Sequence, residues 1–280
     1  MDKRVVHRQA ELREELETAN VGLVPTMGAL HEGHLALIRR SVSDNERTVV
    51  SLFINPTQFN NPADLAAYPR DLDRDLARAA EAGADLIYAP DVPEVYPDGF
   101  ATSVEVAGLT DKWDGTARPG HFKGVATVVT ILLNSVRPAR SYFGEKDFQQ
   151  LVVVRRLHRD LALPGEIVGC PTVRDEDGLA LSSRNARLSP DERKAAATIP
   201  RVLTQMVELA ASGERRSSKL LQVGNLVLFD ELLVTCDYLA IVDPENLEPV
   251  EVVSPGSRAL IAARVGPVRL IDNMELLPST

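Results

Sequence analysis

Short apolar runs alternate with helical patterns in the first part of the chain, and this alternation limits the possible folds more than any other feature. Runs at 21–25, 48–54 and 85–90 are short, and the second is rich in β-branched residues, as expected for buried strands. Segments between them, at 35–42 and about 73–82, have a helical pattern. This order predicts βαβ units and an α/β fold with a doubly wound parallel sheet.

The flanking segments extend the same pattern. Helices are expected at 8–19, 122–136 and 148–161, and another strand at 166–173. The stretch 91–121 contains Pro, Gly and Asp. It is expected to be irregular, as a loop or a small side sheet over the site.

The composition changes near residue 185, which indicates a second domain. Ser189 is suited to cap a helix that begins at Pro190 and runs, rich in Ala and Leu, to about Ser212. A second helix is expected at 218–233, although Gly224 weakens it. Three strand-like runs follow, at 237–242, 259–263 and 268–271. The expected domains are therefore 1–173 and 174–280, the second a smaller α+β unit.

Composition excludes some classes of function. The 280 residues are 44% hydrophobic and 25% charged, and the net charge is −9, which argues against sequence-independent nucleic-acid binding. Cys170 and Cys236 have no CxxC spacing, so a disulfide framework or thiolate zinc site is not expected. No apolar stretch approaches the roughly 18 residues of a membrane span. We therefore expect a soluble cytoplasmic protein with no membrane partner.

The segment Pro25–His34, PTMGALHEGH, is expected to follow the first strand and open into a helix. A helix N-terminus presents unpaired N–H groups and a partial positive charge, which favour phosphate binding. His31 and His34 are three residues apart and so lie on one face of the first turn, where both can donate to phosphate oxygens. The alternative is a pair of capping or metal-binding histidines. The pattern is not HExxH, however, and no third zinc ligand is evident.

Two further segments contain phosphate-binding residue types. Phe143–Gln150 begins where an apolar run gives way to a helix. Its Lys146 is a compact cation suited to a β- or γ-phosphate, and Asp147 could hold a ribose hydroxyl or help to bind a metal. Leu181–Asn185 combines two hydroxyls with a guanidinium. Alone, the first would be an exposed charge run and the second a solvated loop.

Phe53–Phe59 follows the second expected strand, at the carboxyl edge of the sheet. Ligands of open α/β sheets bind at that edge. Asn55 and Gln58 could therefore fix a small polar substrate. The alternative is a turn set by Asn55 and the proline after it.

Two charged segments have less certain roles. Arg118–Phe122 could bring another basic group over the site or begin a helix. Asp71, Asp73 and Asp75 could touch a metal, but a solvated helix terminus is favoured for them. The ligands of any metal are left unknown.

Taken together, these segments resemble the pantothenate synthetases. The similar motifs run through almost the whole chain at near-constant spacing: PTMGALHEGH, FINPTQF, YPRDLDRD, RPGHF, GEKDFQQL, GLALSSRN and RLIDN. The first, together with GEKDFQQ and LSSRN, is specific to that family. HxGH alone is shared with nucleotidylyltransferases and class I aminoacyl-tRNA synthetases. Thr57 departs from the Met expected in many members, which implies looser packing against pantoate.

The resemblance implies a Rossmann-like N-terminal domain and a smaller C-terminal lid, usually in a homodimer. It implies condensation of (R)-pantoate with β-alanine, using ATP and Mg²⁺, to give pantothenate, AMP and pyrophosphate. His34 matches the catalytic acid, and the other expected catalytic residues are His31, Lys146 and Arg184. The positions that match the ATP site are Met27, Gly28, Ala29, Leu30, His31, Glu32, Gly33, His34, Gly144, Glu145, Lys146, Asp147, Val173, Leu181, Ser182, Ser183 and Arg184. Gln58 and Gln150 match substrate positions, and Asn55 is a further candidate.

The implied reaction has two steps, formation of a pantoyl-adenylate and attack on it by the β-alanine amine. Neither needs a protein nucleophile, in agreement with the lack of an evident Ser–His–Asp or Cys–His arrangement. A nucleotidylyltransferase acting on a phosphate acceptor is the nearest alternative. The others are an aminoacyl-tRNA synthetase relative, disfavoured by the net charge and the lack of a KMSKS-like run, and a nucleotide-sensing module without catalysis.

Overall fold

The computed structural model describes residues 4–16 and 20–278. The chain divides into two compact units. The first comprises Met1–Glu145 with Val153–Pro171, and the second Lys146–Val152 with Thr172–Thr280. The expected boundary between residues 173 and 174 stays a prediction.

The first unit contains a six-stranded sheet with the order β1-β4-β3-β2-β5-β6, and each pairing in it is parallel. This confirms the predicted doubly wound α/β sheet. The strands are β1 Arg4–Val6, β2 Val21–Thr26, β3 Arg47–Leu52, β4 Leu86–Tyr88, β5 Arg140–Gly144 and β6 Glu166–Cys170.

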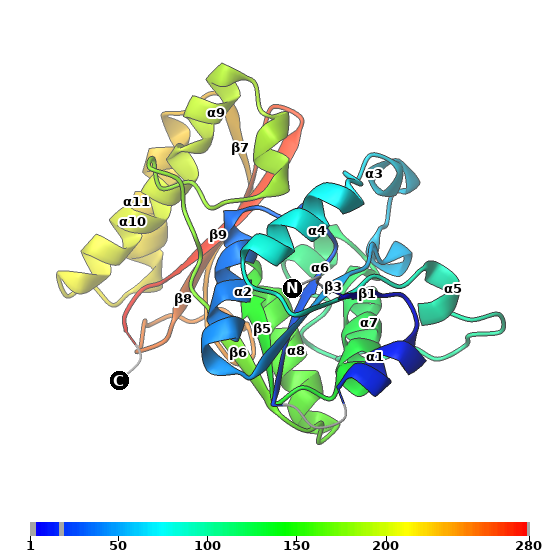
Figure 1. Cartoon of the computed structure of the whole chain (residues 1–280). Helices are drawn as coiled ribbons and strands as arrows, with labels where there is room; N and C mark the ends of the chain where they lie inside the picture. The colour runs from blue at the N-terminus through cyan, green and yellow to red at the C-terminus, as the bar shows by residue number, and fades with distance from the viewer. Residues whose placement is uncertain (1–3, 17–19, 279–280) are drawn as a thin grey trace. The chain divides into compact units, whose positions relative to one another are not determined.

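Helices cover both faces of this sheet. Figure 1 shows α2 (Glu32–Asp44) and α4 (Leu72–Glu81) on one side, and α1 (Gln9–Glu15) and α7 (His121–Val136) on the other. Successive residues of a strand point to opposite faces. Leu23 and Val24 of β2 are both fully buried, which explains why its sequence is a continuous apolar run.

Some elements differ from the sequence-based expectations. Strands β1 and β5 were not predicted, and the last residues of the helix expected at 8–19 lie outside the described residues. Within 91–121, the structure has short helices and no strand. The short helices of the unit are α3 Pro62–Ala66, α5 Val92–Val95 and α6 Asp114–Ala117, and the 3₁₀ turn η1 is Pro56–Gln58.

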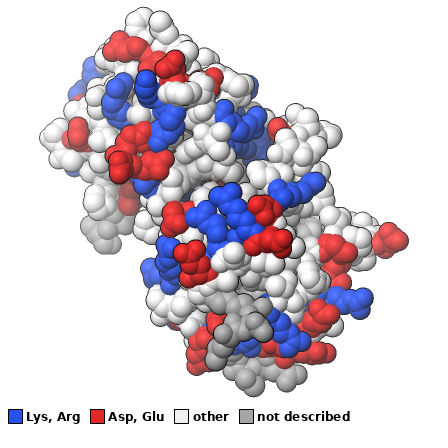
Figure 2. Space-filling model, turned by 45° about the horizontal axis from the view of Figure 1, so that its top comes forward, with Lys and Arg blue, Asp and Glu red and all other residues white. Residues whose placement is uncertain are grey.

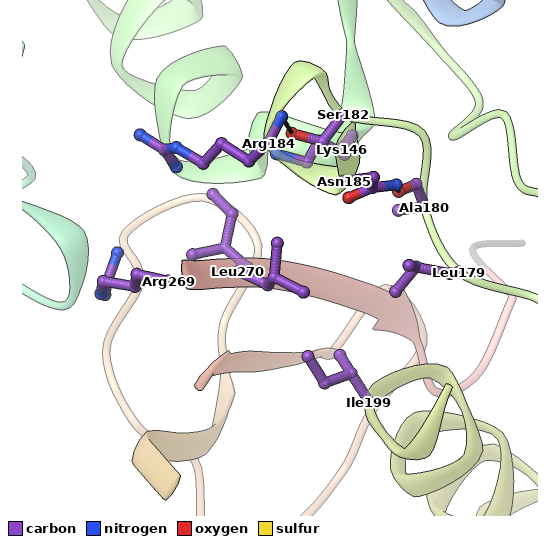
Figure 3. Close-up of a pocket in the computed structure, with 10 residues that line it drawn as sticks. Lys146, Leu179, Ala180, Ser182, Arg184, Asn185, Ile199, Arg269 and Leu270 are labelled. Carbon is purple, nitrogen blue, oxygen red and sulfur yellow. Dashed lines mark hydrogen bonds between the residues drawn. The ribbon is translucent and has the colours of Figure 1, made fainter. Parts of the chain in front are cut away.

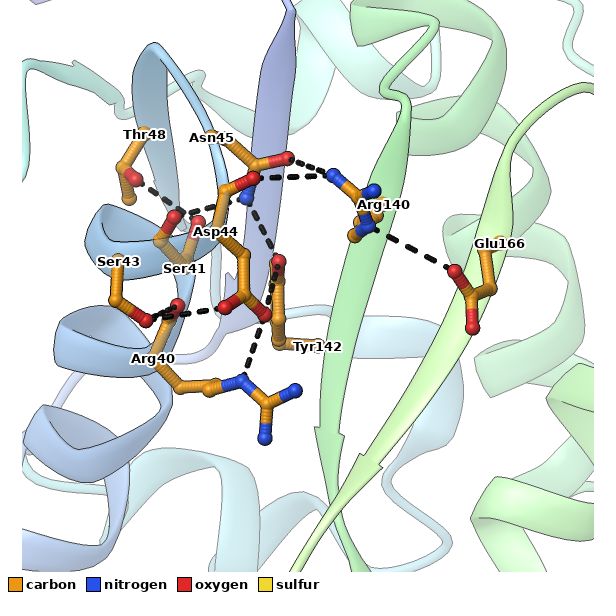
Figure 4. Close-up of polar contacts among 9 residues, drawn as sticks. All are labelled: Arg40, Ser41, Ser43, Asp44, Asn45, Thr48, Arg140, Tyr142 and Glu166. Carbon is orange, nitrogen blue, oxygen red and sulfur yellow. Dashed lines mark hydrogen bonds and ion pairs between the residues drawn. The ribbon is translucent and has the colours of Figure 1, made fainter.

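A cluster of polar side chains joins the end of α2 to the amino ends of the strands (Figure 4). The Tyr142 hydroxyl donates to Asp44 Oδ2 at 3.1 Å and accepts from Asn45 Nδ2 at 2.7 Å. Burial is the main cause that raises the pKa of Tyr142 to about 12. A hydrogen bond from Arg40 is the main cause that lowers the pKa of Asp44. Gly22 makes this contact possible, since a Cβ there would lie 2.5 Å from Asn45 Nδ2.

The second unit has a three-stranded antiparallel sheet in the order β7-β8-β9, which agrees with the expected α+β architecture. Its strands are β7 Val234–Val242, β8 Arg258–Val265 and β9 Val268–Glu275. Its helices are α9 Pro190–Ala196, α10 Thr198–Ala211 and α11 Ser217–Phe229, and the 3₁₀ turn η3 is Ser183–Arg187. Helix α8, Phe148–Asp160, follows the 3₁₀ turn η2, Glu145–Asp147, and contributes its first five residues to this unit.

One expectation for this unit is wrong. The long helix expected from Pro190 to Ser212 is two helices, separated at Ala197. Pro200 has no N–H to donate to the carbonyl four residues before it, so the regular hydrogen-bond pattern is interrupted. Ser189 does cap α9, as predicted, by accepting from Glu192 N at 3.3 Å.

Gly224 lies in the interior of α11 because the helix packs closely there. A Cβ at this position would lie 2.7 Å from Leu239 Cδ2 and 3.0 Å from Met206 Sδ. Close approach to α10 and β7 therefore compensates for the low helix propensity of glycine. Within the described ranges, no helix is both long and apolar enough to span a membrane.

Candidate active site

The sheet topology brings the carboxyl ends of three strands, each followed by a predicted site segment, to one edge. β2 is central and pairs with β3 on one side and β5 on the other. The chain leaves β2 toward β3 and later returns to β5, so the strand order reverses between β2 and β5. Ligands of open α/β sheets bind at such a switch point.

The loop after β2 has an unusual backbone. Gly28 and Ala29 have positive φ values of 81° and 52°, and α2 begins at Glu32 with His31 as its N-cap. A positive φ suits glycine but strains alanine, and such strain is often found at functional sites. The helix starts earlier than the sequence pattern indicated, so the loop lies directly at its N-terminus.

The two histidines lie together, as their spacing predicts. Their ring centroids are 4.1 Å apart, and His34 Nδ1 accepts from His31 N at 3.3 Å. With Nδ1 as an acceptor, a neutral His34 ring carries its hydrogen on Nε2 and can donate from there. Both rings are half-buried at the start of α2. Their roles in catalysis stay predictions.

Asp75 of α4 fixes the main chain of this loop. Its two carboxylate oxygens accept from Ala29 N and Leu30 N, each at 2.8 Å. Arg78, one turn later, donates to Leu30 O at 3.0 Å and to Glu32 Oε1 at 3.0 Å. Two N–H groups of the loop are therefore bound to a carboxylate instead of facing a phosphate.

The expectation of a solvated helix terminus holds for Asp71 and is wrong for Asp75. Asp71 caps α4 by accepting from Arg74 N, whereas Asp75 is only 4% exposed. Gly28 must be a glycine for the same reason, since a Cβ there would lie 2.6 Å from Asp75 Oδ2. A contact between residues 46 positions apart left no local signal in the sequence.

Asn55, after β3, is the centre of a second hydrogen-bond network. It is 1% exposed, and its Oδ1 accepts from Tyr96 OH at 2.8 Å and Thr57 Oγ1 at 2.9 Å. Its Nδ2 donates to Gln58 Oε1 at 3.0 Å and Gly124 O at 3.1 Å. The Asn55 side chain shapes the turn and also orients Gln58. A turn set by Asn55 is therefore compatible with a substrate-binding role for Gln58.

Gln58 connects the two loops. The Gln58 Oε1 accepts from Asn55, so the Gln58 amide N–H groups point away from Asn55. The Gln58 Nε2 lies 2.9 Å from Met27 Sδ. The side chain predicted to bind substrate therefore touches the predicted nucleotide loop.

His121 secures the main chain of the same turn. Its Nδ1 donates to Gln58 O at 2.8 Å, and its Nε2 accepts from Arg118 Nη1 at 3.2 Å. Because Arg can only donate, these contacts require a neutral ring with hydrogen on Nδ1. His121 is also the first residue of α7, which agrees with the helix-start interpretation, and a basic group over the site stays a prediction.

Sequence reasoning missed two residues of this network. Tyr96 follows α5, and burial raises the pKa of its hydroxyl. Its ring lies against Phe100 and Phe53, with centroids at 5.1 and 6.1 Å. Gly124 lets α7 approach the turn, since a Cβ there would lie 2.5 Å from Thr57 O. Tyr96 lies in the irregular stretch 91–121 and Gly124 in helix α7. Neither position has a local sequence pattern that indicates a site.

The second unit contains a small cationic pocket (Figure 3). Lys146, Ser182 and Arg184, three of the predicted ATP-site residues, line it together. Lys146 lies in η2, 18% exposed, with Nζ 3.4 Å from Asp147 Oδ1. Arg269 of β9 also lines the pocket, and its Nε donates to Asp237 Oδ2 at 2.7 Å.

Main-chain contacts fix the loop that carries the serines. Leu181 N donates to Val173 O at 3.0 Å, which joins two predicted ATP-site positions. Ser182 caps η3 by accepting from Arg184 N at 3.2 Å. Its hydroxyl hydrogen stays free to donate, while its oxygen already shapes the turn.

The remaining predicted positions are placed by their elements. Gly144 ends β5, Glu145 begins η2, Ser183 begins η3, and the half-buried Gln150 lies in the first turn of α8. Gly33 is in the first turn of α2. Among the residues that the structure describes, no cluster of three His, Cys, Asp or Glu side chains could hold a metal ion.

Charge on the surface is mixed. Figure 2 shows one face, where Lys and Arg side chains are interspersed with Asp and Glu.

A parallel sheet with an HxGH loop at its switch point defines the class, an α/β nucleotide-binding protein. A pantoate–β-alanine ligase family model matches residues 4–275. A pantothenate synthetase of Thermus thermophilus is 53% identical over 98% of this chain and 100% of its own length. That of Deinococcus radiodurans is 56% identical over 91% of this chain and 93% of its own.

Solved structures agree. The crystal structure of a Thermus thermophilus pantothenate synthetase superposes with a TM-score of 0.95 at 52% identity, covering 98% of this chain and 100% of that one. A Francisella tularensis pantoate–β-alanine ligase, complexed with "Beta-gamma ATP" and β-alanine, gives 0.81 at 32% identity, covering 98% of each chain. The chain belongs to the pantoate–β-alanine ligase family, and it is an enzyme that joins pantoate to β-alanine.

Proposed function

We propose that the enzyme uses ATP to activate pantoate as a pantoyl-adenylate, which then acylates β-alanine. The contact between Gln58 Nε2 and Met27 Sδ carries this proposal. Activation requires the acid and the α-phosphorus of ATP to meet. Gln58, the pantoate candidate, touches the loop that begins the nucleotide site.

In the first step, a pantoate carboxylate oxygen bonds to the α-phosphorus, and the bond from that phosphorus to the β-phosphate oxygen breaks. Pyrophosphate leaves with the electron pair. Negative charge grows on the phosphoryl oxygens and the leaving group, so fixed cations and N–H donors lower the barrier. His31 and His34 would supply these at the start of α2, and Lys146 and Arg184 would supply them from the cationic pocket.

In the second step, the neutral amine of β-alanine attacks the acyl carbon. The bond from that carbon to the phosphate oxygen breaks, AMP leaves, and the new amide nitrogen loses a proton to solvent. The Asn55–Gln58 network would hold the acid during both steps. Gln150 is proposed as a second contact with pantoate.

Mg²⁺ fits this site as a companion of ATP. The described residues offer no cage of three ligands, and Mg²⁺ is usually held by substrate phosphates, waters and one or two carboxylates. Asp147, half-exposed beside Lys146, is the candidate carboxylate. When bound, the ion would neutralise phosphate charge. Asp75 is the poorer candidate, because it is only 4% exposed and its two oxygens already accept main-chain N–H groups.

The resemblance also supports a cytoplasmic homodimer with the second domain as a lid. Sedimentation of the purified enzyme at micromolar concentration tests the first part. A dimeric mass is expected, and a monomer at all concentrations would contradict it.

The decisive experiment measures pyrophosphate release from ATP and Mg²⁺ with pantoate, with and without β-alanine. We expect a pantoate-dependent burst limited to about one equivalent per site without β-alanine, and sustained release of AMP and pantothenate with it. Release that needs β-alanine from the first turnover would contradict a free-standing adenylate. No release with pantoate would indicate a different acceptor, as for a nucleotidylyltransferase.

A further inference from the structure

The end of strand β9 contains two polar residues that have no role in the proposed reaction. The run Arg269–Asn273, RLIDN, forms most of strand β9 and ends in two polar residues. Asp272 and Asn273 are 3% and 4% exposed, and they pair in register with Ile261 and Leu260 of β8. Polar side chains buried this deeply in a strand must be hydrogen-bonded, and their partners show what they hold.

The Asn273 amide has a defined orientation. Arg258 Nη1 lies 2.6 Å from Asn273 Oδ1, and Asn273 Nδ2 lies 3.0 Å from the main-chain oxygen of Lys146. A guanidinium only donates and a carbonyl only accepts, so each contact requires the same placement of amide oxygen and nitrogen. The side chain therefore connects β8 to the turn that bears Lys146.

Arg258 holds the same turn at a second point. Its guanidinium carbon lies 4.1 Å from the ring centroid of Phe148, the first residue of α8. Arg258 is 8% exposed, so this contact is largely removed from water. Together, Asn273 and Arg258 fix the main chain at residue 146 and the side chain at residue 148. The turn that presents the lysine is therefore held at two points.

Asp272 binds Arg174, in the segment that precedes the serine loop. Its carboxylate accepts a bidentate pair from Arg174, at 2.7 and 2.9 Å, and its side chain is 1% exposed. Arg174 also donates to Gly178 O and pairs with Ala180 across a short antiparallel bridge. That bridge leads directly into Leu181, the start of the serine loop. The end of β9 thus holds the supports of two phosphate-binding segments.

We propose that Asn273 is a positioning residue for adenylate formation, which acts by fixing the main chain at Lys146. The proposal rests on the function proposed above, in which Lys146 binds the phosphates of ATP. Asn273 touches no substrate in this assignment. Its effect on the rate must therefore pass through the Lys146 ammonium, and it disappears when that ammonium is absent.

The test is a double-mutant cycle with Asn273→Asp and Lys146→Ala. Asn273→Asp keeps the size of the side chain and pairs with Arg258, so the fold should be retained. It places an oxygen against Lys146 O, which repels the turn. We expect pantoate-dependent pyrophosphate release to fall roughly 10- to 100-fold, with acylation of β-alanine by preformed adenylate little changed. In the Lys146→Ala background, the same substitution should change the rate no more than about twofold.

A second readout needs no turnover. ATP affinity, measured by calorimetry, should weaken in Asn273→Asp and in Lys146→Ala, and the double variant should bind no more weakly than Lys146→Ala. Asn225→Ala is the matched control, since Asn225 Nδ2 donates to Leu221 O at 2.9 Å on the exposed face of α11. It should change neither rate nor affinity.

The proposal would be overturned if the rate losses of Asn273→Asp and Lys146→Ala simply multiply in the double variant. It would also be overturned if Asn273→Asp slows both half-reactions equally. Thermal unfolding of each variant identifies a general loss of structure, which would also slow both half-reactions. If the native enzyme binds ATP but releases no pyrophosphate with pantoate, the proposed function fails. The cycle in ATP affinity then still decides whether Asn273 acts through Lys146.

Discussion

At the amino ends of the parallel strands, Tyr142 and Ser41 bind other side chains of regular elements; at the carboxyl ends, Asp75 and His121 bind the main chain of loops. Tyr142 joins Asp44 and Asn45, and Ser41 joins Thr48 at 2.8 Å. At the other edge, Asp75 accepts two loop N–H groups, and His121 donates to a loop carbonyl.

The difference separates two uses of the same interaction. A contact between side chains of regular elements fixes how those elements pack, and its loss costs stability. A contact with a loop's main chain fixes a conformation that the loop would not otherwise keep, such as the positive φ at Ala29. Its loss should move catalytic groups by fractions of an ångström, which affects rate more than folding.

Replacement of His34 with Ala should give the largest effect. His34 is half-buried, and its ring accepts a hydrogen bond from His31 N in the loop. We expect pantoate-dependent pyrophosphate release to fall roughly 10²- to 10³-fold, as when one donor to a developing anion is removed. Single-turnover kinetics and thermal unfolding measure the two effects separately. An undiminished rate would remove His34 from the catalytic set.

Asp75→Asn tests the support behind this loop. One amide oxygen can still accept, but the new NH₂ group faces an N–H donor, so one of the two bonds at 2.8 Å is lost. We expect the adenylation rate to fall roughly 10- to 100-fold. Asp73→Asn, on the exposed side of the same helix, is the matched control. A loss of stability without loss of rate would place Asp75 with the amino-edge contacts instead.

How much the sequence predicts depends on where the determining contacts lie. Strands β2 and β3 are continuous apolar runs because both faces of the sheet are covered, and such runs are visible locally. The strand β5, Arg-Ser-Tyr-Phe-Gly, was missed because its first residues are polar, and its Arg140 meets polar partners at the amino edge. The loop and histidine pair were predictable, since helix-start geometry follows from a few adjacent residues.

The supporting residues were not predictable in the same way. Tyr96 binds Asn55 across 41 positions, and His121 binds Gln58 across 63. A carboxylate or ring that binds distant main chain has the same local pattern as one at a solvated helix end. Gly22, Gly124 and Gly224 were likewise ordinary in sequence, because the atoms that a Cβ would meet belong to other elements.

Gly22→Ala should damage the amino edge alone. The added Cβ would lie 2.5 Å from Asn45 Nδ2 and closer still to Ser41 Oγ, so the end of α2 must move. Overpacking of this kind costs about 1–3 kcal/mol. Urea unfolding should show the loss, while the rate per folded enzyme stays near that of the parent.

Gly99→Ala is the control without overpacking, since no atom lies within 4 Å of a Cβ there, although its φ of 80° adds strain. A large fall in rate for Gly22→Ala would show that the two edges are coupled.

Tyr142→Phe should give the smallest effect and the sharpest pH dependence. Asp44 would still accept from Arg40, and Asn45 would still donate to Ser41 O. The loss in unfolding free energy near neutral pH should therefore be roughly 0.5–1.5 kcal/mol. The folded-state pKa of Tyr142 is raised to about 12, so the protonated hydroxyl is favoured by folding. Its stabilisation is complete below the unfolded pKa near 10 and is lost as pH rises through about 12.

The parent should therefore lose stability more steeply than Tyr142→Phe between pH 10 and 12, so its advantage in unfolding free energy should be lost across that range. Urea titrations at several pH values measure the gap. Tyr88, whose pKa burial also raises to about 12, contributes equally to both proteins and cancels in the difference. The absence of a gap at every pH would show that Tyr142 stabilises the amino edge by packing alone, because phenylalanine keeps the ring and lacks only the hydroxyl.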